Sequence, residues 1–164
     1  MKLYFMRHSE SVSHTEFKDA DHLRPLSREG QELLKKIAPK LVRQLHSVDY
    51  LISSPYLRAR QSLEILKAQF KKQPESIEID LLSPGYTDHK HLLGYLISLE
   101  VDEIFMLGHE PQIRGFIQYL IGTEESLRLQ VSLASFHVVE IPPSTEYTPG
   151  LGVLCCSVPP EIWL

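Results

Sequence analysis

Short apolar segments, separated by longer segments of helical periodicity, constrain the fold of this chain more than any other feature of its sequence. The apolar segments are residues 2–6, 49–53, 77–82 and 103–107. Strands that alternate with helices form a mostly parallel sheet with helices on both faces. We therefore expect one domain over residues 1–164, built as a three-layer α/β/α sandwich around a mostly parallel central sheet.

The segments between these strands carry the start signals of amphipathic helices. Ser27 can cap a helix that runs to about residue 46, and Pro39 is expected to kink or restart it. Ser54 followed by Pro55 is typical of an N-cap and the first residue of a second helix. Two further helices, over residues 88–99 and from residue 111, and two C-terminal strands, over residues 134–141 and 151–158, complete the pattern.

The composition indicates a globular protein of a reducing compartment. The 164 residues, 43% of them hydrophobic, suffice for a full core, and no apolar run reaches the ~20 residues of a membrane span. Cys155 and Cys156 are adjacent, which suits neither a disulfide nor a metal site, so we expect buried thiols in a cytoplasmic protein. The net charge of −4 makes nucleic acid an unexpected partner, and the lack of a long apolar run does the same for a membrane. The oligomeric state stays open, and a monomer is compatible with the sequence.

The charge is distributed unevenly along the chain. Residues 1–60 contain 11 lysines and arginines against 7 acidic residues, although the whole chain is acidic. This excess predicts an anion site in the first third of the chain; clustering on solvated faces is the alternative explanation.

The carboxyl ends of three predicted strands carry cationic or imidazole groups. The first strand ends at Arg7 and His8, the second is followed by Arg58 in a first helical turn, and the fourth ends at His109. Ligands of parallel sheets bind beyond these strand ends, and helix N-termini favour anions there. Two guanidiniums can hold a phosphoryl group, one neutral imidazole can attack it, and the other can donate a hydrogen bond, with no metal required.

The motifs "MRHSES", "RPLSREG", "ISSPYLRARQS" and "LGHEPQI" resemble those of the histidine phosphatase superfamily, in order and at strand ends. The short chain and "DHLRPLSREG" resemble the SixA-type phosphohistidine phosphatases within it. The resemblance implies a phosphoglycerate-mutase-like fold without a cofactor. It also implies that His8 is the nucleophile and that Arg7, Arg58 and His109 form the phosphate pocket.

Several positions depart from the family pattern. Ser9 stands where the family usually has glycine; it is expected to be a tolerated small residue, or else its hydroxyl donates to an oxyanion. His14 replaces a polar residue that is often asparagine, and either contacts phosphate or lies in solvent. The acid that phosphate-ester members carry after the third strand is missing. The candidates to replace it are Glu110, which follows His109, Asp88, in the loop after the third strand, and Glu10, which follows the first motif. If Glu110 is not the acid, it is expected to cap the helix that begins at residue 111.

A missing acid bears on the substrate, because an alkoxide leaving group needs a proton and the imidazole of phosphohistidine can carry its own. We therefore predict a metal-independent phosphatase that acts on phosphohistidine in proteins. A phosphomonoesterase of a small phosphorylated metabolite is the alternative, and a non-catalytic phosphoprotein-binding domain is a third hypothesis. Two other arginines are expected to have structural roles. Arg60 is expected to point away from the pocket of Arg58, and Arg24 is expected to tie down the loop of residues 9–26.

Overall fold

The computed structural model describes residues 1–45, 47–123, 128–143 and 148–164, which contain six strands and four α-helices. In chain order these are β1 (Lys2–Arg7), α1 (Arg28–Leu41), β2 (Tyr50–Ser53), α2 (Leu57–Lys67), β3 (Glu75–Glu78), α3 (His89–Ser98), β4 (Glu103–Gly108), α4 (Gln112–Ile121), β5 (Phe136–Glu140) and β6 (Val153–Val158). No helix within these ranges has the length and apolar character needed to span a bilayer.

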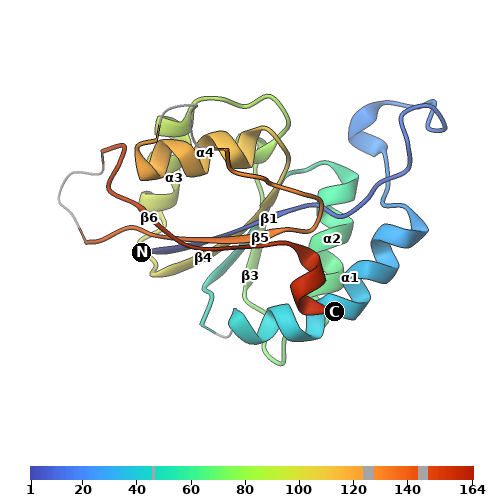
Figure 1. Cartoon of the computed structure of the whole chain (residues 1–164), viewed down its shortest axis with the longest axis horizontal. Coiled ribbons are helices and arrows are strands. Elements are labelled where there is room, and N and C mark those ends of the chain that lie inside the picture. Colours follow the sequence, from blue (N-terminus) through green and yellow to red (C-terminus); the bar gives the residue numbers. More distant parts are fainter. Residues whose placement is uncertain (46, 124–127, 144–147) are drawn as a thin grey trace.

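The strands form one sheet in the order β3-β2-β4-β1-β5-β6. The pairs β1–β4, β2–β4 and β2–β3 are parallel, whereas β5 runs antiparallel to both of its neighbours. Helices α1 and α2 cover one face and α3 and α4 the other (Figure 1). The predicted three-layer sandwich with a mostly parallel sheet is therefore confirmed.

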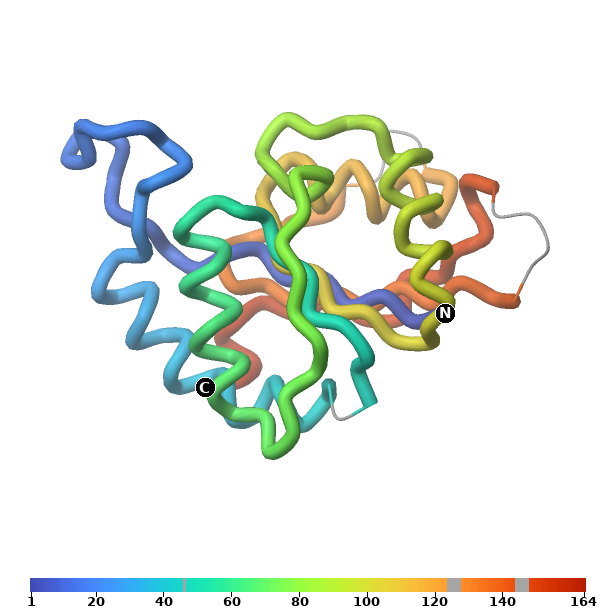
Figure 2. Tube along the Cα trace, turned by 180° about the vertical axis from the view of Figure 1, so that it is seen from behind, coloured from blue at the N-terminus to red at the C-terminus, as the bar shows by residue number. Residues whose placement is uncertain are grey.

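The central strand β1 is buried on both faces, which is why its sequence is almost continuously apolar. Leu3 and Phe5 pack in the core beneath α3 and α4, while Tyr4 and Met6 pack in the core beneath α1 and α2. Full burial of side chains of this size contributes about 1.5–3 kcal/mol each. The loop of residues 9–26, which continues from the end of this strand, stands out from the body of the molecule (Figure 2).

Helix α1 begins as predicted but ends earlier. The hydroxyl of Ser27 accepts a hydrogen bond from the N–H of Gly30 at 3.0 Å, which confirms the N-cap. Pro39 lies in the last turn of α1, and the chain continues into a 3-10 turn over Val42–Gln44. Residue 46, the predicted end, lies outside the described residues.

The bounds predicted for the third strand are wrong, and so is the predicted cap of α2. β3 covers only Glu75–Glu78, and Asp80–Leu82 form a 3-10 turn.

The N-cap of α2 is Tyr56 rather than Ser54, because Tyr56 is still extended, with φ −64° and ψ 133°. The hydroxyl of Ser54 instead accepts the N–H of Tyr56 at 3.3 Å and contacts His109.

The C-terminal strands are shorter than predicted, and one of the cysteines is not buried. β5 and β6 lie within the predicted ranges, and residues 144–147 of the turn region between them lie outside the described residues. Both cysteines are unpaired, with Cys156 half-buried and Cys155 exposed. The prediction of a buried Cys155 is wrong because β6 is an edge strand whose alternate residues point away from the core.

Candidate active site

Three parallel strands end at one edge of the sheet, where a cavity of about 520 Å³ opens. Arg7 is in register with Gly108, and Ser53 with Leu107, so the residues that follow these strands meet. The cavity is lined by Arg7, His8, Glu10, Ser11, His14, Asp21, Arg24, Arg58, Pro84, His109, Glu110 and Leu133. The structure thus brings together the four residues predicted to bind and attack phosphate, and adds several from the loop of residues 9–26.

The His8 imidazole is buried and held at both ring nitrogens. Its Nδ1 lies 2.6 Å from the carbonyl oxygen of Ser9, which can only accept, so Nδ1 carries the proton. Its Nε2 accepts a hydrogen bond from Nε of Arg58 at 3.2 Å. The neutral tautomer therefore directs a lone pair from Nε2 toward a guanidinium.

His109 is ordered by a short chain of hydrogen bonds. The N–H of Tyr56 donates to the Ser54 hydroxyl, and that hydroxyl forms a hydrogen bond with Nε2 of His109, 2.9 Å away. Nδ1 of His109 has no partner among the described residues. The ring centroids of His8 and His109 are 4.9 Å apart, which is close enough for both imidazoles to contact one bound group.

Burial and neighbouring cations keep both imidazoles neutral. Burial lowers the pKa of His8 to about 4, with further lowering by the charges of Arg58 and Arg7. Burial also lowers the pKa of His109 to about 2, helped by His8 and Arg58. A neutral imidazole retains the lone pair that a nucleophile needs.

The two predicted phosphate-binding arginines approach from different elements. Arg7 ends β1 and donates from Nη1 to the carbonyl oxygen of Val131 at 2.9 Å, while its Nε is buried without a partner among the described residues. Arg58, in the first turn of α2, is 4% exposed and lies over the ring of Tyr56 at 4.9 Å. Arg58 is buried and Arg7 half-buried, and unused N–H groups on their guanidiniums beside the cavity suit a phosphoryl group.

Ser9 is structural rather than directed at the cavity. It is fully buried, its hydroxyl donates to the carbonyl oxygen of Gly30 at 3.0 Å, and its φ is not in the left-handed region. A Cβ on Gly30 would lie 2.1 Å from the carbonyl oxygen of Glu10, so α1 packs directly on the backbone beside Ser9. Of the two predicted roles for Ser9, that of a fitted small residue agrees with these contacts.

The loop of residues 9–26 is tied down by Arg24, as predicted. Arg24 donates to the Ser11 hydroxyl at 2.6 Å, to the carbonyl oxygen of Val12 at 2.8 Å and to Asp21 Oδ1 at 2.8 Å. His14 lies between Arg24 Nη2, at 3.0 Å, and Asp21 Oδ1, at 3.5 Å, on the rim of the cavity.

The three candidate acids occupy different environments. Asp88 caps α3 by accepting the N–H of His91 at 2.9 Å, and it does not line the cavity. Glu10 lies on the exposed rim. Glu110 lines the cavity, forms a 2.9 Å ion pair with Arg114 and has a pKa raised by burial. Its predicted capping role is wrong, because α4 has no side-chain cap at its N-terminus.

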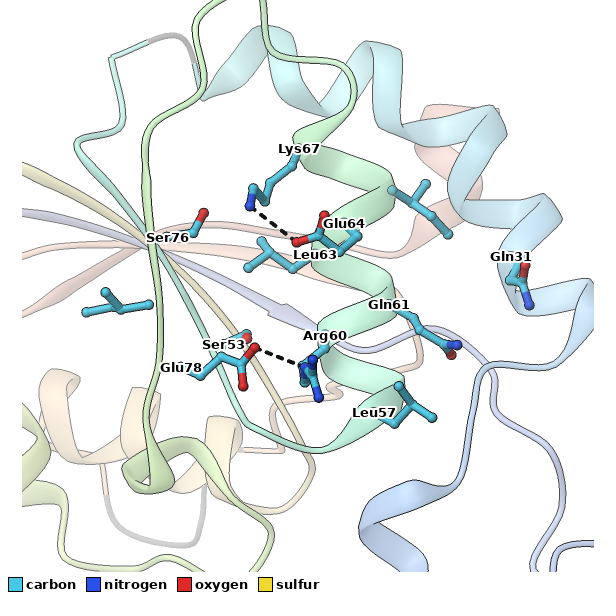
Figure 3. Close-up of a pocket in the computed structure, with 12 residues that line it drawn as sticks. Gln31, Ser53, Leu57, Arg60, Gln61, Leu63, Glu64, Lys67, Ser76 and Glu78 are labelled. Carbon is cyan, nitrogen blue, oxygen red and sulfur yellow. Dashed lines mark hydrogen bonds and ion pairs between the residues drawn. The ribbon is translucent and has the colours of Figure 1, made fainter.

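Arg60 points away from this cavity, as predicted. It forms a 2.9 Å ion pair with Glu78 at a separate groove of about 480 Å³ between α2 and β3 (Figure 3). Residues two positions apart are separated by about 200° around the helix axis, so Arg58 and Arg60 lie on opposite sides of α2.

Asp21 and Ser54 contribute to the site, although neither was predicted for it. The pairing of Asp21 with Arg24 could have been predicted, because the two residues are three positions apart and opposite charges at this spacing attract each other within one helical turn. Ser54 carried the misleading signal of a helix cap. Among the described residues, no three histidine, cysteine or acidic side chains gather as a metal site requires.

Comparison with known proteins agrees with this geometry. Residues 3–82 match the sequence model of the histidine phosphatase superfamily (branch 1). The protein histidine phosphatase SixA in complex with tungstate superposes with a TM-score of 0.83 at 22% identity, over 99% of each chain. The α-ribazole phosphatase of Shigella flexneri gives 0.78 at 15% identity, over 98% of this chain and 97% of that one.

A curated relative is similar over most of the chain. An uncharacterized protein of Picosynechococcus sp. is 29% identical over an alignment of 120 residues, which covers 69% of this chain and 68% of that protein. The chain is similar to the histidine phosphatase superfamily over residues 3–82, as its motifs predicted, and its fold is the phosphoglycerate-mutase-like fold of SixA. Together with the geometry of the site, these matches support a phosphatase.

Proposed function

We propose that this protein is a histidine phosphatase that hydrolyses phosphohistidine in proteins through a covalent intermediate on His8. The arrangement of the His8 ring carries the proposal: Nδ1–H is bound to the Ser9 carbonyl and the Nε2 lone pair faces Arg58. A neutral imidazole locked in one tautomer is prepared to attack phosphorus.

In the first step, a bond forms from His8 Nε2 to phosphorus while the bond from phosphorus to the leaving group breaks, and that electron pair departs with the leaving group. The positive charge that develops on the ring is stabilised by the Nδ1–H bond to Ser9. Arg7 and Arg58 neutralise the phosphoryl oxygens, and His109 donates a hydrogen bond to one of them. Water then attacks phosphorus, the bond to Nε2 breaks, and inorganic phosphate leaves.

The leaving group decides between substrates. An imidazole protonated on its second nitrogen departs as a neutral molecule, whereas an alkoxide requires an acid. Asp88 is engaged at the start of α3, which removes one candidate acid. The loss of this candidate supports the proposed substrate class. The unpaired cysteines agree with the cytoplasmic location that we predict.

One observation favours a second function, a phosphomonoesterase of a small metabolite. Glu110 lines the cavity, and burial raises its pKa, which favours the protonated form that a general acid needs. Hydrolysis of an alkyl phosphate would then use Glu110 to protonate the departing oxygen.

Trapping tests the mechanism. The protein is incubated with a ³²P-labelled phosphohistidine protein and quenched in alkali, where phosphohistidine survives. We expect label on the native chain and none on His8→Ala, while His22→Ala, at an exposed histidine that does not line the cavity, keeps the label. Native chain that binds phosphoprotein without acquiring label would indicate the non-catalytic binding domain instead.

Glu110→Gln separates the two substrates. Turnover of phosphohistidine should change by less than about 3-fold, because its leaving group supplies its own proton. If simple alkyl phosphates are hydrolysed faster than the phosphohistidine protein, and if Glu110→Gln lowers that activity by about 100-fold, the phosphomonoesterase is correct.

A further inference from the structure

Asp21 holds the guanidinium of Arg58 from the side opposite the nucleophile. Its main-chain carbonyl oxygen accepts from Nη1 at 2.9 Å, and its carboxylate Oδ2 accepts from Nη2 at 3.1 Å. The other carboxylate oxygen, Oδ1, accepts from Nε of Arg24 at 2.8 Å. One acidic residue thus bridges two arginines that line the cavity.

These contacts determine which edge of Arg58 meets the reacting atoms. A guanidinium has five N–H groups in a rigid plane. Asp21 occupies one N–H on each terminal nitrogen, and Nε–H points at Nε2 of His8. The Tyr56 ring lies against the Arg58 guanidinium, 4.9 Å from its centre, so the guanidinium plane is held as well.

We infer that Asp21 is a positioning residue for phosphoryl transfer, an inference that rests on the proposed function. By fixing the terminal nitrogens of Arg58, it turns the edge bearing Nε–H toward His8. When a phosphoryl group takes the lone pair of His8 Nε2, the Nε–H of Arg58 transfers its hydrogen bond to a phosphoryl oxygen. That bond strengthens as charge spreads over the equatorial oxygens, so Asp21 acts chiefly on the transition state.

The same bridge connects the loop of residues 9–26 to α2. Arg24, which holds one carboxylate oxygen of Asp21, is itself anchored to Ser11 and Val12. The loop begins directly after the nucleophile and returns to Arg58 through Asp21, although the latter two residues are 37 positions apart. The position of the loop therefore sets the orientation of a phosphate-binding arginine.

The test compares Asp21→Ala and Asp21→Asn with Asp19→Ala, a carboxylate in the same loop that accepts from the N–H of Ala20. We expect Asp21→Ala to lower kcat by about 100-fold with KM changed less than about 3-fold, since an electrostatic contact made in the transition state is worth this much. Asp21→Asn, which keeps one acceptor oxygen, should lose about 10-fold. Asp19→Ala should stay within 2-fold.

Inhibitor affinities separate positioning from a merely structural role. Vanadate, which forms a five-coordinate adduct with a nucleophile, should bind Asp21→Ala weaker in proportion to kcat, while inorganic phosphate changes less than about 3-fold. Equal losses for vanadate and phosphate with a lowered Tm would show a structural anchor. Tighter phosphate binding with raised kcat/KM would show that Asp21 competes with substrate. Either result overturns the inference.

The two proposals fail differently. A native chain that acquires no label refutes the proposed function, whatever Asp21 does. A labelled native chain whose Asp21→Ala variant turns over within 2-fold of it refutes the inference alone.

Discussion

Lowering the pH from 7 to 5 should destabilise this protein through three buried histidines. His8 and His109 lie in the cavity, and His137 is buried on β5 between the hydroxyls of Ser135 and Ser157, at 2.8 and 2.9 Å. Burial lowers the pKa of His137 to about 4, as it does that of His8, and that of His109 to about 2. An unfolded histidine titrates near 6.5.

The direction of the effect follows from these values. Because the folded pKa lies below the unfolded pKa, the unfolded chain binds more protons between about pH 6.5 and 4, so stability is present above pH 6.5 and is lost as the pH falls toward 4. Each histidine loses about 1.8 kcal/mol from pH 7 to 5, or about 5 kcal/mol for the three. This is comparable to the whole stability of a typical domain, about 5–15 kcal/mol. The raised pKa of Glu110 offsets part of it.

Urea unfolding at pH 7, 6 and 5, with linear extrapolation, measures the loss. Most carboxylates titrate below this window, so histidine dominates it. His8→Gln should reduce the pH dependence by about one third. Equal unfolding free energies at pH 7 and 5, or a pH dependence that His8→Gln leaves unchanged, would refute the reasoning.

Three further predictions concern side chains at and near the cavity. Gly30→Ala should destabilise the fold by about 1–3 kcal/mol, because the new Cβ has no room, whereas Gly94→Ala in an open position of α3 should stabilise it by about 0.5–1 kcal/mol; urea midpoints compare them. Arg58→Ala should lower kcat/KM by about 100-fold or more, and Arg60→Ala, at the opposite groove, by less than 2-fold in the same assay. Ser54→Ala should lower kcat about 10-fold by releasing the His109 ring, and should lower the free energy of unfolding by about 1–3 kcal/mol because a buried hydrogen-bond partner is lost; equal activity would contradict that role.

The site places two neutral imidazoles among guanidiniums, and this combination explains its electrostatics. Burial and, beyond it, the charges of the arginines lower the pKa of His8, so its imidazole keeps a lone pair well below neutral pH. The arginines remain charged beside Asp21, whose pKa is held low by hydrogen bonds from Arg24 and by Arg58, against the opposing effect of burial. The charged guanidiniums and neutral imidazoles proposed to bind an anion are therefore already in place around the cavity.

The order of strands and helices could be predicted because hydrophobic periodicity is a local signal. β1, β4 and α4 lie close to their predicted bounds. The third strand was misjudged because Ile79, Leu81 and Leu82 continue the apolar pattern into a turn. An apolar side chain packs against the core from a 3-10 turn as well as from a strand, so composition alone does not separate the two.

The sequence by itself determined that Arg7, His8, Arg58 and His109 meet at one edge of the sheet, because parallel strands carry their following residues to the same side. Only the tertiary structure decided how these groups are oriented. Ser54 reaches His109 across 55 positions, and Asp21 reaches Arg58 across 37. Such contacts leave no periodic trace in a sequence, because they depend on atoms that approach only when the strands, the helix and the loop have packed together.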